Sequence, residues 1–163
     1  MSRRTEALAA RIEAGADSLA AFAEGISDAE WRTPVGADWR DRRPIGVIVH
    51  HVGFMYPIEI DVARTIASGR AVTDVTWEGV AELNAAHARN HVDVTKAAAL
   101  ELLRRNSRAA ADAVRAFTDD DLDRAAPFSL SHAAPVTAQF VVEDHALRHS
   151  WHHLARIRAR LGR

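Results

Sequence analysis

The sequence contains no cysteine, and this absence excludes several kinds of site at once. Disulfide bonds, cysteine-based metal centres and a thiol nucleophile of the protein's own cannot form. Charge of one sign is also lacking, because 21 lysines and arginines face 22 aspartates and glutamates. A formal net charge of -1 provides no basic field that would attract nucleic acid or an anionic membrane. Any thiol chemistry therefore has to use an external thiol.

Long apolar runs are missing as well, and the first six residues do not resemble a secretory signal. What is present is an ordinary globular composition, with 48% hydrophobic and 26% charged residues, which argues against disorder. A chain of 163 residues is long enough to bury one core. We therefore expect one cytoplasmic domain spanning residues 1–163, with neither a nucleic acid nor a membrane as its partner.

Apolar residues recur at spacings of three and four along most of the chain, which predicts amphipathic helices. The expected long helices cover residues 4–24, 44–69, 95–117 and 137–161. A weaker pattern predicts a further helix over 77–91, with Thr76 as its cap. Because no stretch alternates cleanly as a strand would, the predicted class is all-α, a helical bundle with one or two short extra helices.

Local signals punctuate this pattern. Ser27 and Thr118 each begin a stretch with the spacing of a capping box, which predicts two short helical turns. Pro57 lies inside the second long helix and cannot donate a hydrogen bond to Gly53, so we expect a kink or a local break there. Residues 125–135, which include two prolines, are expected to form a loop.

Histidines gather in the last predicted helix, where four of the nine in the sequence fall within nine residues. His149 and His153 are four residues apart, so both imidazoles can reach one point on the same helical face. On the second long helix, His51 lies at the centre of the apolar face and His50 on its margin. Two buried neutral imidazoles without partners are costly, and one shared cation would satisfy both. His51, His149 and His153 are therefore the candidate metal ligands.

Other interpretations of the histidines stay open. His145 and His149 have the same spacing, so the ligating pair could lie one turn earlier. His87 and His91 also have it and form the best rival cluster. A solvated histidine-rich face without a metal would produce the same pattern. The arginines near the end of the chain complement the helix dipole and are expected to be solvated.

Two segments resemble motifs of the DinB-like superfamily. The first is Pro44-Ile-Gly-Val-Ile-Val-His-His51-Val, and the second is His149-Ser-Trp-His-His153-Leu-Ala-Arg-Ile157-Arg. The resemblance places that family's metal ligands on His51, His149 and His153 and covers nearly the whole chain. The chain departs from many members at Leu154-Ala155, where they carry Gly-Gln. It departs from some members at His149, where they carry a glutamate.

The resemblance implies a four-helix bundle in up-down-down-up order that binds zinc, nickel or iron and forms a homodimer. Characterised members include transferases and isomerases that use mycothiol, bacillithiol or glutathione. Three histidines leave coordination positions open, which is typical of a catalytic rather than a structural metal. Such a metal can lower the pKa of water, as in a hydrolase, or bind an external low-molecular-weight thiol.

The expected function is therefore that of a metal-dependent enzyme acting on a small molecule, with thiol-dependent transfer or isomerisation placed slightly ahead of hydrolysis. The alternatives are a non-catalytic bundle that binds a metal or a small ligand, and a helical interaction domain with incidental histidines. The sequence assigns no catalytic and no cofactor-binding residue. Glu59, Asp61, Asn84 and His87 are conceivable supporting groups, although surface or capping roles are the more common ones for such residues.

Overall fold

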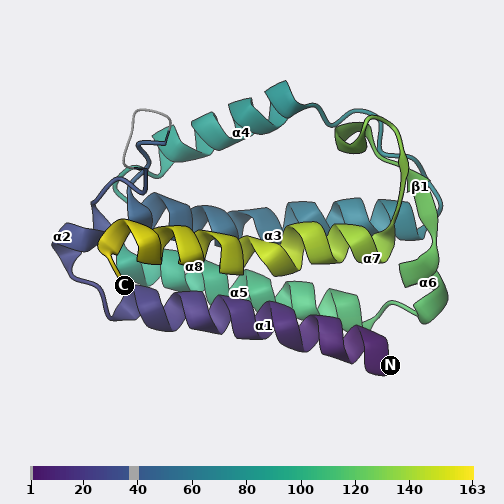
Figure 1. Ribbon diagram of the computed structural model, residues 1–163, viewed down its shortest axis with the longest axis horizontal. Helices are drawn as coiled ribbons and strands as arrows, with labels where there is room; N and C mark the ends of the chain where they lie inside the picture. The colour runs from purple at the N-terminus through teal and green to yellow at the C-terminus, as the bar shows by residue number, and fades with distance from the viewer. Residues whose placement is uncertain (1, 37–40) are drawn as a thin grey trace.

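Four long helical segments form the body of the molecule in the computed structural model, which describes residues 2–36 and 41–163. They are α1 (Arg3–Glu24), α3 (Ile45–Ala67), α5 (Lys96–Arg115) and a composite last segment, made of α7 (Ala138–Val141), η2 (Val142–Leu147) and α8 (Arg148–Leu161). In Figure 1, α1 and the last segment run in one direction while α3 and α5 run in the other. The predicted all-α, up-down-down-up four-helix bundle is confirmed.

The helix α4 (Trp77–Asn90) lies in the long connection between α3 and α5, outside the four-helix body (Figure 1). The Thr76 hydroxyl caps it by accepting a hydrogen bond from the Gly79 amide at 3.0 Å, as the sequence predicts. Within α4, all of which is described, His87 alone is buried. This helix therefore has little apolar contact to hold it against the bundle.

Short elements complete the chain. Capping boxes begin both α2 (Asp28–Trp31), at Ser27, and α6 (Asp119–Asp123), at Thr118, as predicted. The expected loop over 125–135 is partly wrong, because the strands β1 (Ala125–Pro127) and β2 (Pro135–Thr137) pair there in antiparallel fashion. A short 3-10 helix, η1 (Ser129–Ser131), lies between them. Each strand has only three residues, too few to show an alternating pattern.

The last helical segment is not uniform, because η2 is a π-helix. A π-helix has more residues per turn than an α-helix, so it shifts the face that later residues present. On a regular helical wheel Glu143 falls within the apolar face of this segment. In the structure its side chain is 42% exposed and accepts a hydrogen bond from Gln139. The π-helical stretch thus accounts for the imperfect apolar pattern.

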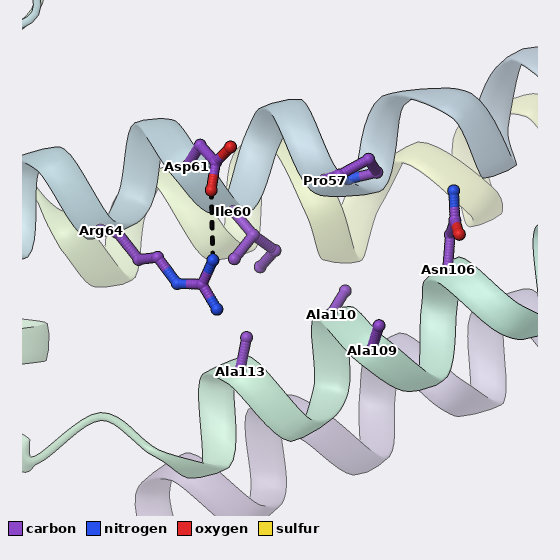
Figure 2. A pocket seen from close by; sticks show the side chains of 8 residues that line it. All are labelled: Pro57, Ile60, Asp61, Arg64, Asn106, Ala109, Ala110 and Ala113. Atoms are coloured by element: carbon purple, nitrogen blue, oxygen red, sulfur yellow. Dashed lines mark hydrogen bonds and ion pairs between the residues drawn. The ribbon is translucent and has the colours of Figure 1, made fainter.

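Of the kink or local break expected at Pro57, the break is wrong, because helix α3 continues through this residue. The carbonyl of Gly53, which Pro57 leaves without its helical partner, accepts a hydrogen bond from Asn106 Nδ2 of α5 at 2.9 Å. Figure 2 shows Pro57 and Asn106 facing each other across a shallow groove between α3 and α5, with a cavity volume of about 130 Å³. A donor on a neighbouring helix therefore satisfies the freed carbonyl.

Helix α3 is also, among the described residues, the one helix whose length and composition would allow it to cross a membrane. Of its most apolar window, 72% is buried inside the protein. It packs against α5 along much of its length and also contacts α7, η2 and α8. Its apolar composition is therefore that of a central core helix, and it presents His50 and His51 toward two different neighbours.

Candidate functional site

His51, His149 and His153 come together at one place between α3 and α8. Each offers a ring nitrogen, and these three nitrogens lie within 4.8 Å of one another. The His51 ring stands nearly perpendicular to the other two, with its centroid 5.0 Å from that of His149 and 5.6 Å from that of His153. The four-residue spacing on α8 therefore does place two imidazoles beside the one that α3 provides.

Burial keeps two of these imidazoles, those of His51 and His153, neutral. His51 and His153 are only 4% and 5% exposed, and His149 is half-buried. Burial lowers the pKa of His51 to about 2, and the nearby His149 and Arg43 add to this effect. Burial also lowers the pKa of His153 well below its ordinary value, with His149 contributing next. Near neutral pH both rings carry a free lone pair, the form that binds a metal.

Glu59 supports His149 from behind. Its Oε1 lies 2.7 Å from His149 Nδ1, which fixes Nδ1 as the protonated nitrogen and leaves Nε2 as the one with a lone pair. Glu59 is 7% exposed, so the interpretation of this residue as a surface or capping group is wrong. A carboxylate that accepts a hydrogen bond from the second ring nitrogen of a ligating histidine is the usual arrangement around protein-bound metals.

The donor set fits a divalent metal. The Nδ1 atoms of His51 and His153 and the Oε2 atom of Glu59 are buried and have no hydrogen-bond partner within the described part of the chain. Buried polar atoms without partners are costly, and three imidazoles with one supporting carboxylate suit zinc, nickel or iron. The residues present therefore match the group that the sequence led us to expect.

A cavity of about 390 Å³ opens directly onto all three histidines. Apolar side chains of α3 and α4 and of the segment around η1 form about half of its wall; they include Met55, Ile58, Val62, Trp77, Val80, Phe128 and Leu130. Polar groups lie at the histidine end, where Glu59 and Asn84 join the lining. Arg43 and Arg148 also line the wall, and they are paired with Asp41 and Asp144 respectively. A concave space of this size with apolar walls and a few polar groups is typical of small-molecule sites.

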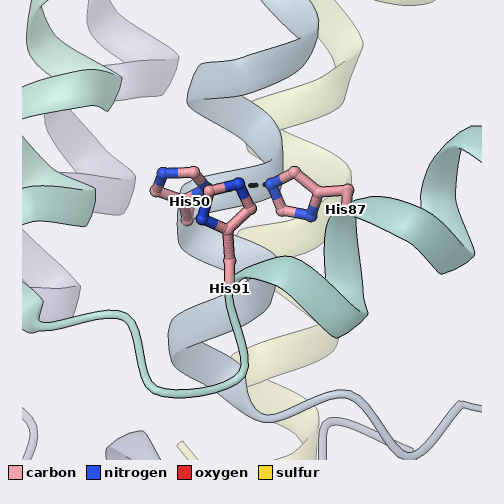
Figure 3. Close-up of side chains that lie close together, drawn as sticks. All are labelled: His50, His87 and His91. Atoms are coloured by element: carbon pink, nitrogen blue, oxygen red, sulfur yellow. Dashed lines mark hydrogen bonds between the residues drawn. The ribbon is translucent and has the colours of Figure 1, made fainter.

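A second histidine group lies next to the first. His50, His87 and His91 also offer three ring nitrogens within 4.8 Å of one another (Figure 3). The sequence singled out His87 and His91 as a rival pair and placed His50 on the margin of α3. The structure shows that these residues do not replace a member of the first group. Instead they form a separate cluster between α3 and α4.

The remaining sequence candidates lie outside both groups. His145 lines the cavity and packs edge-on against Phe128, with ring centroids 5.9 Å apart, so the pair one turn earlier is not the one that converges on His51. The Asp61 side chain is 73% exposed and pairs with Arg64. Asn84 lines the cavity wall. Of the terminal arginines, Arg158, Arg160 and Arg163 are exposed as expected, whereas Arg156 is partly buried and forms an ion pair with Asp41 at 3.0 Å.

Comparison with known proteins finds the same fold in a solved structure. Among solved structures, the chain is similar to YfiT from Bacillus subtilis, with a TM-score of 0.73 and 18% sequence identity over 99% of this chain and 90% of that one. That protein is described as "a probable metal-dependent hydrolase with an unusual four-helix bundle topology". No curated protein matches the sequence. The family model of the DinB superfamily matches residues 11–157. The chain therefore belongs to the DinB superfamily.

Proposed function

We propose that this protein is a metal-dependent enzyme that acts on a small molecule bound in the cavity between α3, α4 and α8. The observation that carries the proposal is the convergence of three histidines on the wall of a cavity of about 390 Å³. A structural metal is normally enclosed by four protein ligands, whereas three ligands facing a cavity leave room for a reactant. His51, His149 and His153 would hold the metal, which would be zinc, nickel or iron.

When bound, the metal would act as a Lewis acid that lowers the pKa of a coordinated water or thiol. The protein's own groups prepare the site for this chemistry. Glu59 holds the His149 ring in one orientation, and its second carboxylate oxygen, Oε2, is free to accept a proton. The apolar wall of Met55, Val62 and Phe128 limits access of bulk water to the same space.

Hydrolysis is the reaction that this arrangement supports best. A water molecule needs a proton acceptor beside it, and Glu59 is a buried carboxylate in the lining of the cavity. The description of YfiT as a "probable metal-dependent hydrolase" supports the same reaction class, on a shared fold. This places hydrolysis ahead of the thiol-dependent transfer or isomerisation that the sequence put first.

Thiol-dependent transfer is the second candidate, and one observation favours it. Arg43 and Arg148 both line the cavity, and the Arg43 Nη1 atom is buried without a partner in the described part of the chain. Small cellular thiols such as glutathione carry carboxylates, which arginine binds well. Since the chain has no cysteine, the thiol would be an external one. Homodimer formation and a cytoplasmic location stay predictions of the sequence.

Metal analysis with paired activity assays tests the proposal. Protein purified without a histidine tag should contain a metal that is lost in His149→Ala and retained in His152→Ala, a control histidine on the same helix but outside both groups. Glu59→Gln keeps the size of the side chain, and we expect it to bind the metal about 10- to 100-fold more weakly.

A panel of esters and amides, with and without added thiols, then separates the reaction classes. Turnover that needs the metal but no thiol supports hydrolysis, and turnover only with a thiol supports transfer. If His149→Ala retains all the metal of the wild type, the proposed site is wrong. A metal-loaded wild type that turns over no substrate in either panel would leave a non-catalytic metal-binding bundle.

A further inference from the structure

Apolar packing does not explain how helix α4 is attached to the bundle. It forms one wall of the cavity through Trp77, Val80 and Asn84, yet its buried residue is a histidine and Trp77 is 62% exposed. Burial of apolar surface is the main force that docks helices, so this helix has little of it. In contrast, α3 and α5 bury apolar side chains along their whole length. Something other than apolar packing has to hold α4 in place.

The buried residue of α4 is the centre of a histidine cluster. His87 and His91 lie one turn apart at the carboxyl end of α4, and His50 reaches them from α3 (Figure 3). His50 Nδ1 lies 2.8 Å from His87 Nε2, and the ring of His91 lies over that of His50 with a centroid distance of 4.1 Å. All three rings therefore meet at the point where α4 comes closest to the bundle.

We propose that His50, His87 and His91 bind a second transition-metal ion of the zinc type, which fastens α4 to α3 beside the first site. The proposal depends on these three residues alone and not on the chemistry of His51, His149 and His153. Imidazole nitrogens suit zinc, copper and nickel, whereas magnesium and calcium prefer oxygen. A bound ion that bridges two helices adds its binding energy to the stability of their contact.

The spacing of the donor atoms suits such an ion. One ring nitrogen from each histidine lies within 4.8 Å of the others. Zinc–nitrogen bonds of about 2.0–2.1 Å in a tetrahedron place the nitrogens about 3.3 Å apart. The 2.8 Å separation of His50 Nδ1 and His87 Nε2 then has to widen slightly, and the longer ones have to shorten. Small rotations about side-chain bonds are enough for both changes.

An unsatisfied ring nitrogen also points to an ion at this place. His87 is 4% exposed, and its Nδ1 atom has no partner among the described residues. Three imidazoles packed this closely can form only a few hydrogen bonds with one another, so a cation is the partner that would satisfy them together.

Counting metal ions in single variants tests the second site. Metal-free protein loaded with zinc and freed of excess should hold about two ions per chain, and His91→Ala and His149→Ala about one each. Val92→Ala is the matched control for His91→Ala, because Val92 is the next residue and is 58% exposed. His50→Gln provides a second variant, should His91→Ala not fold. Circular dichroism checks the fold of each.

The outcomes separate this proposal from the proposed function. If the wild type holds a single ion that His91→Ala retains, or that both variants lose, the second site does not exist. If that single ion is lost in His91→Ala but retained in His149→Ala, the second site stands and the first one fails. Because each site has its own variant, neither failure can be mistaken for the other.

Hydrogen exchange tests the fastening of α4 independently of the count. Loading the second site should slow amide exchange of residues 80–90 by about 10-fold or more relative to the metal-free protein. His91→Ala should abolish this protection, while His149→Ala and Val92→Ala should retain it. Equal exchange of α4 in the loaded and metal-free wild type would show that the ion does not hold the helix.

Discussion

The two histidine groups begin at neighbouring residues of α3 but lie against very different partners. His51 faces α8, a core helix that buries Ser150, His153, Leu154 and Ile157. His50 faces α4, which buries only His87. The first group has the buried carboxylate of Glu59 behind it, whereas no carboxylate is hydrogen-bonded to the described rings of the second. Three histidines thus form a site within the packed core in the first group, and a contact with a loosely packed helix in the second.

This difference predicts how strongly the structure around each group depends on a bound metal. Around His51 the bundle is already packed, so under our proposal a metal would add reactivity and some stability to a structure that exists without it. Around His50 we propose that the position of α4 itself depends on the cluster, so a metal there would add order. The cavity borders the first group and is lined by residues of both α3 and α4, whereas the residues of the second group do not line it. On these two proposals the first group would provide the chemistry, and the second would hold the helix that forms one wall of the cavity.

Replacing the two adjacent histidines one at a time gives the largest expected effect. His51→Ala should abolish binding at the first site and remove the thermal stabilisation that this ion provides. That stabilisation is about 2.7 kcal/mol when free metal is about 100 times its Kd. His50→Ala should leave the first site loaded and change only the second. Metal content and thermal unfolding with and without zinc measure both.

The outcome that would break the comparison is simple. If His51→Ala leaves metal content and the zinc-dependent rise in unfolding temperature unchanged, His51 is not a ligand. If His50→Ala and His51→Ala lose the same ion, the two groups act as one site and the contrast between them disappears.

The sequence predicts the helices well because their signals are local. The Thr76 and Thr118 caps bind amides three residues away, and the apolar stripes repeat within each helix. It predicts the first histidine group because His149 and His153 share one face of one helix and His51 is central on another. It misses contacts between distant segments. Asn106 satisfies the Gly53 carbonyl, and Glu59 meets a histidine 90 residues later.

The second histidine group was missed for a related reason. The pair His87 and His91 is visible in the sequence, but the weak apolar pattern of α4 does not show which way the helix faces. His50 appears on the margin of α3 because a helical wheel represents the faces of one helix and not its contacts with other helices. The π-helical stretch at η2 depends on how the last segment packs and has no composition signal of its own. Tertiary contacts, absent from local patterns, decide all three.

Glycine substitutions sharpen the contrast between the packed core and α4. A Cβ at Gly53 would lie 2.8 Å from the backbone nitrogen of Leu103, so α3 and α5 would have to separate. We expect Gly53→Ala to lower the free energy of unfolding by about 1–3 kcal/mol. A Cβ at Gly79 meets only the Thr76 hydroxyl at 3.3 Å. Gly79→Ala on α4 should therefore change stability by less than about 1 kcal/mol.

Denaturant unfolding of the two glycine variants in metal-free protein measures this pair. Equal midpoints for Gly53→Ala and wild type would mean that α3 and α5 are not packed as closely as described. A loss from Gly79→Ala as large as that from Gly53→Ala would mean that α4 belongs to the same cooperative core.

Two hydrogen bonds, one between core helices and one at the start of α4, allow the same comparison with smaller expected losses of stability. Tyr56 of α3 and Ser150 of α8 are fully buried, and their hydroxyl oxygens lie 2.7 Å apart. Tyr56→Phe removes this link and leaves the serine hydroxyl without its partner, so we expect a global loss of about 1 kcal/mol. Thr76→Ala removes the hydrogen bond that caps α4. We expect a loss of stability of similar size, confined to that helix.

The two hydrogen-bond variants should differ in which backbone amides exchange faster. The hydrogen bond between Tyr56 and Ser150 joins two core helices. Its loss in Tyr56→Phe should therefore accelerate exchange of the slowest amides, which open only on global unfolding. Thr76→Ala should accelerate exchange within residues 77–90 of metal-free protein and leave the slowest amides unchanged. Zinc should restore protection mainly at the carboxyl end of α4, near His87 and His91, because the lost cap lies at the opposite end. If Thr76→Ala instead accelerates the slowest amides, α4 unfolds with the bundle, and its position does not depend on the histidine cluster.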